Sequence, residues 1–409
     1  MPDAPNMPKK VLLGISGGIA AYKTPELVRA LVRDGCEVEI ILTDAAARLV
    51  SPLSLSTLSK RRVWRDADLL SDELGWTIPH ISLSGWADAL VVAPCTANVL
   101  RMAAQGDSST LLGAAMLAYG RPILFFPAMN PHMLANPATA ENGRLLAERG
   151  HVVVDPDAGP LACGYEGKGR LPSTEAMMDE VRTMLCPDKD YAGKKILITA
   201  GPTVEAIDPV RFISNPSTGR MGYALAAAAR YRGADVVLVS GPSNERAPSG
   251  VRVVHVKSAE EMLSACLAEL PGTDAVIKAA AVGDYRVKRY APQKIKRDGA
   301  DMLTLELVQN PDIAREISAR KRPGQILVGF AAETENVREN AVAKIARKGL
   351  DMVVANDVSA PGSGFGGDTN SVSIYFAEGC GRTVPPAISG SKLEVASGIL
   401  DHISTLFSK

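Results

Sequence analysis

The chain of 409 residues lacks an excess of charge of either sign, because its 45 lysines and arginines are balanced by 45 aspartates and glutamates. Without a net field, its overall charge offers no attraction for nucleic acid or for an acidic membrane surface. It also lacks any apolar run close to the roughly 20 residues that span a bilayer. The short run VLLGI near the start breaks at Ser16, before a signal-peptide core can form. We therefore expect neither nucleic acid nor a membrane as a partner, and any anionic ligand must be held by local sites.

Paired cysteines are also missing. The cysteines lie far apart, without the CxxC spacing of a zinc or dithiol site and without the density of a secreted disulfide scaffold. This spacing fits a reducing compartment, so we expect a cytoplasmic protein. The six cysteines are Cys36, Cys95, Cys163, Cys186, Cys266 and Cys380.

The length of the chain favours about two hydrophobic cores. Short β-branched runs alternate with Ala-rich helical stretches throughout, which is typical of βαβ units around a parallel sheet. The helical pattern stops at the polar, Pro-containing stretch 186–190, and KKILITAGPT then begins the same rhythm again. We predict an α/β protein with two Rossmann-like domains on parallel sheets, residues 1–188 and 189–409.

Three turns in the first half follow predicted strands. Residues 14–20 form a Gly-rich strand-to-helix turn, where backbone N–H groups and the helix dipole favour a phosphate. Residues 93–98 and 126–131 end two other strands. The ends of parallel strands collect at one edge of a sheet, where ligands bind. Taken alone, the Gly-rich turn fits a turn without a ligand about as well as a phosphate site, because it lacks GxGxxG spacing.

The segments SGGIAAYK, APCTANVLRMAAQG, PAMNPHM and ACGYEGKGR, in this order, resemble the homo-oligomeric flavin-containing cysteine decarboxylases, specifically their phosphopantothenoylcysteine branch. The resemblance covers nearly all of residues 9–186 and implies that flavoprotein fold and FMN as cofactor. The sequence departs from the family at Ser109 and Thr110, where an acidic pair is usual, and at Leu134, where an aromatic residue is usual. The positions that match FMN contacts are Ser16, Gly17, Thr43, Thr96, Asn98 and Ser108.

The same resemblance assigns chemistry to three residues. His80 matches the active-site histidine and is the candidate for proton abstraction, although a histidine at the start of a strand, where we expect His80, is more often structural. Asn130 is the candidate for binding the carboxylate and amide of the substrate. The alternative is that it is an ordinary turn asparagine before proline. Cys163 lies in a Gly-rich flap and matches the acid of the last step. The alternative is that it is an inert cysteine.

The family chemistry explains why a decarboxylase needs a flavin. Loss of carbon dioxide from the cysteine carboxylate leaves a carbanion without an electron sink. The resemblance implies that FMN first oxidises the thiol, so that the carboxylate lies beta to a C=S group. The product after reduction is 4'-phosphopantetheine.

The second half carries TAGPT, IDPVRFISN and STGRMG, and then AAAVGDYR, APQKIKR, NPDI, VGFAAET and LDMVVAND. In this order they resemble the phosphopantothenate-cysteine ligases over about residues 194–360. That family activates the carboxylate of 4'-phosphopantothenate with CTP as an acyl-cytidylate, releases pyrophosphate, and lets the amine of L-cysteine displace CMP. The two resemblances together imply a bifunctional enzyme of coenzyme A biosynthesis.

The ligase resemblance also implies site residues. Lys294 matches the nucleotide-contacting lysine, although a basic cluster such as 294–297 is usually a solvated face. Asn215 matches a residue that handles the acyl-cytidylate, and Asp284 is the candidate ligand for Mg²⁺ on the triphosphate. The remaining positions that match CTP contacts, together with Asp284, are Lys278, Ala279, Ala280, Pro311, Asp312, Ile313, Ala314, Phe330, Lys344 and Lys348.

Three competing interpretations fit the sequence less well. An NAD(P)-dependent oxidoreductase requires GxGxxG followed about 20 residues later by an acid, which neither half shows. A non-catalytic flavoprotein subunit would not need Cys163, His80 and Lys294. A flavin prenyltransferase leaves ACGYEGKGR and the whole second half unexplained. The resemblance further implies a homo-oligomer, with flavin sites between subunits of trimers, paired ligase domains and a dodecamer as the assembly.

Overall fold

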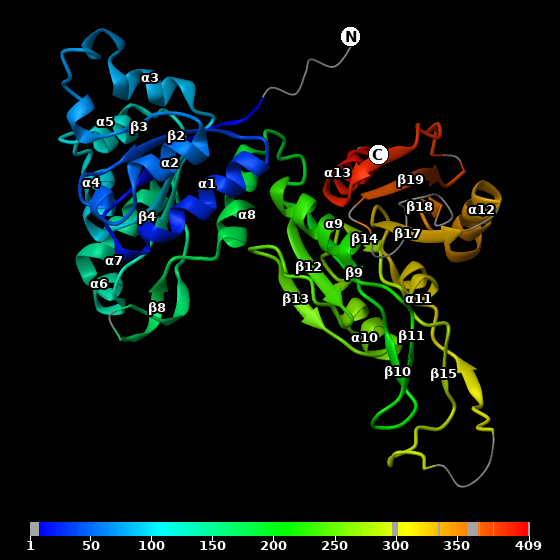
Figure 1. Ribbon diagram of the computed structural model, residues 1–409. Helices are drawn as coiled ribbons and strands as arrows, with labels where there is room; N and C mark the ends of the chain where they lie inside the picture. Colours follow the sequence, from blue (N-terminus) through cyan, green and yellow to red (C-terminus); the bar gives the residue numbers. More distant parts are fainter. Residues whose placement is uncertain are drawn as a thin grey trace. The chain divides into compact units, whose positions relative to one another are not determined.

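The structure is a computed structural model that describes residues 8–162, 164–296, 302–333, 336–357, 367, 369–378 and 380–407. The chain divides into two compact units, Met1–Cys186 and Pro187–Lys409. Each unit is an α/β sandwich around its own sheet (Figure 1). The predicted α/β class is therefore confirmed.

The first unit is built on a six-stranded parallel sheet with the order β3-β2-β1-β4-β5-β6. Its central strands are buried along nearly their whole length, so they are continuous apolar runs rather than alternating ones. The strands are β1 (Lys10–Ile15), β2 (Glu37–Leu42), β3 (Val63–Trp64), β4 (Ala89–Cys95), β5 (Ile123–Pro127) and β6 (Val152–Val153).

Helices cover both faces of this sheet and bury alternate residues of each strand. Leu13 of β1 packs in one apolar cluster with α1, α2 and α8, whereas Leu12 packs in the other with α3, α4, α5 and α7. The helices are α1 (Thr24–Arg33), α2 (Pro52–Ser59), α3 (Pro79–Trp86), α4 (Ala97–Gln105), α5 (Leu111–Ala118), α6 (Pro131–Ala135), α7 (Pro137–Glu148) and α8 (Thr174–Leu185). Short 3-10 helices are η1 (Ile19–Lys23), η2 (Ala46–Arg48), η3 (Asp66–Asp68) and η4 (Gly75–Thr77).

A hairpin of β7 (Asp157–Pro160) and β8 (Glu166–Arg170) packs on the turn that follows β5. The Met129 N–H donates to the Gly169 carbonyl at 3.0 Å. A Cβ on Gly169 would lie 2.1 Å from the Met129 carbonyl oxygen, and the φ of +149° also favours glycine. The glycines of the predicted flap therefore allow its backbone to lie directly on the 126–131 turn.

The second unit has an eight-stranded sheet with the order β13-β12-β9-β14-β17-β18-β19-β20. The strands from β13 to β18 are parallel, but β19 pairs antiparallel with both of its neighbours. The prediction of parallel sheets missed this antiparallel edge. The strands are β9 (Lys195–Ala200), β12 (Asp235–Ser240), β13 (Arg252–His255), β14 (Ala275–Lys278), β17 (Ile326–Glu333), β18 (Met352–Asp357), β19 (Thr369–Phe376) and β20 (Ile388–Ser391).

One face of this sheet is covered by α9 (Arg220–Tyr231) and α13 (Lys392–Ser404). The other face is covered by α10 (Ala259–Glu269), α11 (Ile313–Arg320) and α12 (Val337–Lys348). The start of the unit is fastened to its last helix through Arg232. The guanidinium of Arg232, 8% exposed, pairs with Asp190 at 2.5 Å and with Asp401 at 2.6 Å. The buried Tyr191 adds a hydrogen bond from its hydroxyl to the Leu400 carbonyl.

Two antiparallel strand pairs, which we call the arm, extend from the main sheet of the second unit (Figure 1). One pair is β10 (Val204–Ala206) with β11 (Phe212–Ser214), and the other is β15 (Tyr285–Val287) with β16 (Leu307–Gln309). β10 lies against β15, so the two pairs form one extension.

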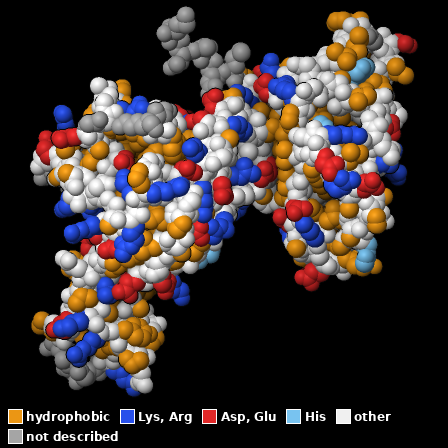
Figure 2. Space-filling view, turned by 180° about the vertical axis from the view of Figure 1, so that it is seen from behind, with side chains coloured by type: hydrophobic (Ala, Val, Ile, Leu, Met, Phe, Trp, Pro, Cys, Tyr) orange, Lys and Arg blue, Asp and Glu red, His pale blue; other side chains and the backbone are white. Residues whose placement is uncertain are grey.

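The surface agrees with the balanced composition. On the face in Figure 2, lysines and arginines are interspersed with aspartates and glutamates. Within the part of the chain that the structure describes, no helix combines the length and the apolarity needed to cross a bilayer.

Candidate active sites

A cavity of about 570 Å³ lies at the carboxyl ends of β1, β4 and β5 in the first unit. Its walls come from the three predicted turns, through Gly17, Thr96 and Asn130, and from the β7–β8 hairpin, through Pro160 and Gly169. The expected convergence of these turns on one edge of the sheet is what the structure shows.

The turn after β1 is closely fitted to its neighbours. Ser16 is buried; its hydroxyl donates to the Pro94 carbonyl at 2.7 Å and accepts from the Thr96 N–H at 3.0 Å. A Cβ on Gly17 would lie 2.4 Å from the Cβ of Ala45, so only glycine fits there. Because two glycines follow Ser16, a ligand can approach the backbone of this turn closely. Such a turn at a sheet edge is suited to the phosphate of a flavin nucleotide. The helix that follows begins as the 3-10 turn η1 and continues as α1.

Asn130 occupies the N-cap position of α6. Its side-chain oxygen accepts from the His132 N–H at 2.9 Å, so the turn role weighed against a substrate role exists in the structure. Asn130 nevertheless lines the cavity. The Asn130 side chain therefore stabilises the turn and also forms part of the cavity wall.

Of the predicted flavin contacts only Gly17 and Thr96 line this cavity, and Ser16 lies buried directly behind the turn. Thr43 follows β2 and accepts from the Ala46 N–H, Asn98 contacts Met102 from α4, and Ser108 is exposed beyond α4. The three residues that depart from the decarboxylase family also lie outside the cavity wall. Ser109 is exposed, Thr110 caps α5 by accepting from the Gly113 N–H, and Leu134 lies half-buried in α6. Cys163 lies outside the described residues.

The expectation of a strand start at His80 is wrong, because Pro79 begins the helix α3 and His80 is its second residue. His80 does not line the cavity either. Its Nδ1 atom is buried and finds no hydrogen-bond partner among the described residues. Buried polar nitrogens are normally satisfied, and unsatisfied ones are found at functional positions. The Nδ1 atom of His80 can therefore still form a hydrogen bond that none of the described residues makes.

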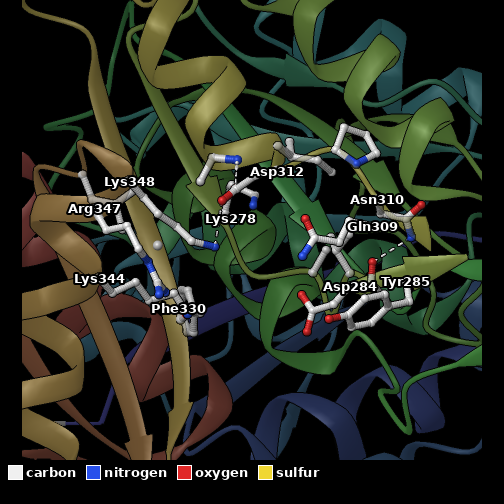
Figure 3. A pocket seen from close by; sticks show the side chains of 18 residues that line it. Lys278, Asp284, Tyr285, Gln309, Asn310, Asp312, Phe330, Lys344, Arg347 and Lys348 are labelled. Atoms are coloured by element: carbon white, nitrogen blue, oxygen red, sulfur yellow. Dashed lines mark hydrogen bonds and ion pairs between the residues drawn. The ribbon is translucent and has the colours of Figure 1, made fainter. Parts of the chain in front are cut away.

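A second cavity, of about 490 Å³, lies at the edge of the second sheet (Figure 3). All predicted CTP contacts except Ala279 and Lys294 line it. Lys278, Lys344, Arg347 and Lys348 gather on one side, and Asp284 lies on the other (Figure 3). The sheet edge and one face of α12 therefore assemble a basic chamber.

The charges in this chamber perturb one another. Burial and the neighbouring charge of Lys348 lower the pKa of the Lys278 ammonium to about 8. Burial by itself would raise the pKa of Asp312, but Lys348, 3.2 Å away, and backbone N–H donors outweigh it, so that pKa is lowered. Lys344 donates to the Phe330 carbonyl at 2.8 Å. With several cations and one ion-paired carboxylate beside them, this wall is suited to a polyanion.

A third cavity, of about 480 Å³, adjoins the basic chamber. It contains Asn215 and Ala279 together with the turn 216–219 before α9. The Asn215 side chain donates to the Ala281 and Val282 carbonyls at 3.3 Å each. Residues common to both cavities are Ala280, Val282, Asp284, Phe330 and Lys344. Two ligands can therefore meet at this shared wall.

Lys294 is the predicted contact that the structure leaves outside both cavities. It is exposed on residues 291–296 of the arm. Sequence reasoning also missed wall residues, namely Tyr285, Gln309, Asn310 and Arg347. Arg347 follows Lys344 by three residues on α12, so helical spacing could have found it. The described residues contain no group of three or more His, Cys, Asp or Glu side chains placed to hold a metal ion by themselves.

Fold and sites together define a two-domain α/β enzyme with a turn-lined cavity in one unit and a basic chamber joined to a second cavity in the other. Residues 3–185 match the family described as Flavoprotein, and residues 191–406 match the DNA/pantothenate metabolism flavoprotein C-terminal domain.

Known relatives match both halves at once. The coenzyme A biosynthesis bifunctional protein CoaBC of Bacillus subtilis strain 168 is 44% identical over 401 residues, which is 97% of each chain. The protein of that name from Escherichia coli strain K12 is 44% identical over 91% of each chain. A crystal structure of the C-terminal domain of such a protein is 40% identical, covers 54% of this chain and 98% of its own, and has a TM-score of 0.44. The chain belongs to the family of bifunctional coenzyme A biosynthesis proteins and carries a flavoprotein domain in its first half.

Proposed function

We propose that the second unit condenses 4'-phosphopantothenate with L-cysteine at the expense of CTP, through an acyl-cytidylate, and releases CMP and pyrophosphate. The first unit then converts 4'-phosphopantothenoylcysteine to 4'-phosphopantetheine and carbon dioxide with FMN. The observation that carries the proposal is the basic chamber that shares a wall with a second cavity, because activation of an acid requires two ligands to meet end to end.

In the ligase unit, the basic side of the chamber takes the triphosphate. Lys278, Lys344, Arg347 and Lys348 supply fixed positive charge where negative charge develops as pyrophosphate leaves. The acid occupies the adjoining cavity, with its carboxylate at the wall shared by the two. Asn215 lies at that junction, where it can orient the acyl group for attack by the cysteine amine. If Mg²⁺ accompanies the triphosphate, Asp284, on the opposite side of the chamber, is the carboxylate that would hold it and would help to neutralise the phosphate charge.

In the decarboxylase unit, the turn with Ser16 and Gly17 holds the phosphate of FMN, which when bound supplies the two-electron oxidation and reduction. Asn130 binds the substrate carboxylate from the cavity wall. His80 takes a proton from the substrate, and Cys163 returns one in the last step. The hairpin β7–β8 excludes water from the cavity.

Two predicted site residues that lie outside the cavities indicate how the subunits assemble. His80 and Lys294 do not line the sites of their own chain in this structure, yet both are assigned to the chemistry. We propose a homo-oligomer in which these residues complete sites at subunit contacts, with the dodecamer that the family resemblance implies. Alternatively, the arm that carries Lys294 moves and brings the lysine to the basic chamber of its own chain.

A direct test uses the purified full chain. We expect a yellow protein with flavin absorbance that releases pyrophosphate over many turnovers only when CTP, 4'-phosphopantothenate and L-cysteine are all present. Without L-cysteine, the acyl-cytidylate should form once and release at most one equivalent of pyrophosphate per site. Pyrophosphate release from another nucleoside triphosphate at an equal rate would contradict the assignment of CTP. A colourless protein that gains no decarboxylase activity on addition of FMN would contradict the assignment of the first unit.

The two units are expected to work separately. Residues 1–188 should be yellow and decarboxylate, and residues 189–409 should be colourless and ligate, because each unit has its own apolar clusters and the second fragment keeps Asp190 and Tyr191. Absorbance and the two assays on purified fragments check this. Recovery of ligase activity only after mixing the fragments would contradict it.

Affinity for CTP is expected to fall as the pH rises above about 8, the pKa of Lys278. Below that pH the amine is already charged, so its charge is in place before binding. Above it, binding a phosphate must first protonate the amine, so affinity falls by up to about tenfold per pH unit. Calorimetry of CTP binding in buffers with different ionisation enthalpies measures this proton uptake.

The control is Lys278→Met, which should bind CTP more weakly but take up less proton at high pH. Lys321→Met, which removes a lysine paired with Asp351 outside the chamber, should keep the wild-type profile. Equal proton uptake in the wild type and in Lys278→Met would assign the titration to another group.

A further inference from the structure

The loop between β10 and β11 contains a buried carboxylate that the proposed chemistry does not use. Asp208 is 2% exposed, and its Oδ1 accepts from the Val210 and Arg211 N–H groups at 2.8 Å each. These are the bonds expected of an aspartate that stabilises its own turn. They use only one of its two oxygens.

The second oxygen reaches a distant segment. Oδ2 of Asp208 accepts from the Ile295 N–H at 3.2 Å, 87 residues further along the chain. The guanidinium of Arg211 lies 3.4 Å from the same oxygen and also donates to the Ile295 carbonyl at 3.2 Å. Both backbone groups of Ile295 are therefore bound by the β10–β11 loop.

A second bond fixes the other end of the same segment. The Ala291 N–H donates to the Ile207 carbonyl at 3.0 Å. Lys294 lies between these two attachments, with an exposed side chain. The loop thus holds the backbone on each side of a lysine that it does not contact through the side chain.

Electrostatics keep the anchor ionised. Burial alone would raise the pKa of the Asp208 carboxyl, but the N–H groups of Val210, Ile295 and Arg211 and the charge of Arg211 outweigh it, so the pKa is lowered. The anchor therefore remains a carboxylate, with both oxygens as acceptors, across the neutral pH range.

We propose that Asp208 is a positioning residue for the ligase reaction, which fixes residues 291–296 so that Lys294 is presented to the nucleotide in one backbone geometry. This inference rests on the proposed role of Lys294. It adds a residue that touches neither substrate and that acts through the backbone of Ile295. The same anchor serves whether Lys294 works in its own chain or in a second copy.

The test compares Asp208→Asn, Lys294→Gln and the double variant in the full chain. An asparagine has one acceptor oxygen, so if that oxygen keeps the turn bonds its NH₂ group faces the Ile295 N–H and the anchor is lost. We expect pyrophosphate release to fall about tenfold in Asp208→Asn. The double variant should be no slower than Lys294→Gln, because both changes act through one lysine.

Hydrogen exchange of residues 291–296 gives a readout that does not depend on activity. Asp208→Asn should speed this exchange, whereas Glu205→Gln should not. Glu205 is a matched control because it is a buried carboxylate on the same arm that accepts from the Ala259 N–H and not from the 291–296 segment. If Asp208→Asn does not fold, Arg211→Lys, which removes the bond to the Ile295 carbonyl, should speed the same exchange.

The outcomes separate this inference from the proposed function. Unchanged exchange at 291–296 in the folded variant, or rate losses that multiply in the double variant, would overturn the role of Asp208. A Lys294→Gln variant with the wild-type rate would instead overturn the proposed role of Lys294, and the positioning role with it, even if exchange at 291–296 still responds to Asp208.

Discussion

The variant His80→Asn is expected to keep its yellow colour and to lose reduction of the flavin by 4'-phosphopantothenoylcysteine. A neutral imidazole nitrogen can accept the substrate proton, whereas an amide cannot. Loss of such a proton acceptor slows a reaction by roughly 100-fold to 10,000-fold. Anaerobic rapid mixing, followed at the flavin absorbance band, measures the rate.

The control for this variant is His151→Asn, in the same unit. The Nδ1 of His151 accepts from the Ile123 N–H and burial lowers the pKa of its imidazole, but it does not line the cavity. In the folded His151→Asn variant, the substrate should reduce the flavin at the wild-type rate. Unimpaired reduction in His80→Asn would remove this histidine from the chemistry and leave its buried Nδ1 unexplained.

The second large effect is expected in the ligase unit, where Lys294→Gln should lower acyl-cytidylate formation and pyrophosphate release together. One preorganised charge at a developing anion is worth roughly 100-fold or more in rate. Quenched-flow assays with labelled CTP measure the intermediate and pyrophosphate in the same sample.

Lys288→Gln provides the matched control on the arm. Lys288 pairs with Glu306 at 3.2 Å on the surface, an interaction of the kind that contributes little. It should keep the wild-type rate. If Lys294→Gln made the acyl-cytidylate as fast as the wild type, Lys294 would be an ordinary surface lysine.

The resemblance to the ligase family named Lys278, Lys344 and Lys348, and local periodicity explains why the three lie together. Lys344 and Lys348 lie one helical turn apart on α12, and Lys278 ends a strand whose neighbours finish at the same sheet edge. These rules place such residues together without knowledge of the tertiary structure. The alternation of strands and helices likewise predicted both parallel sheets up to β18.

Apart from Arg347, the wall residues that were missed depend on long-range pairing. Tyr285 and Gln309 reach the chamber because β15 and β16 pair with each other in register. No turn or period in the sequence fixes that pairing. The antiparallel edge formed by β19 and β20 was missed for the same reason, since strand direction depends on the path of the connection and not on the composition of the strand.

The two ion pairs of Arg232 have a consequence for the architecture of the second unit. Asp190 stands at its beginning and Asp401 near its end, yet both contact one guanidinium. A domain whose ends meet in this way can be fused to another domain through either terminus, and can be circularly permuted, without disturbing its sheet. The order of decarboxylase before ligase in this chain is therefore a property of how the gene is arranged and not a requirement of the ligase fold.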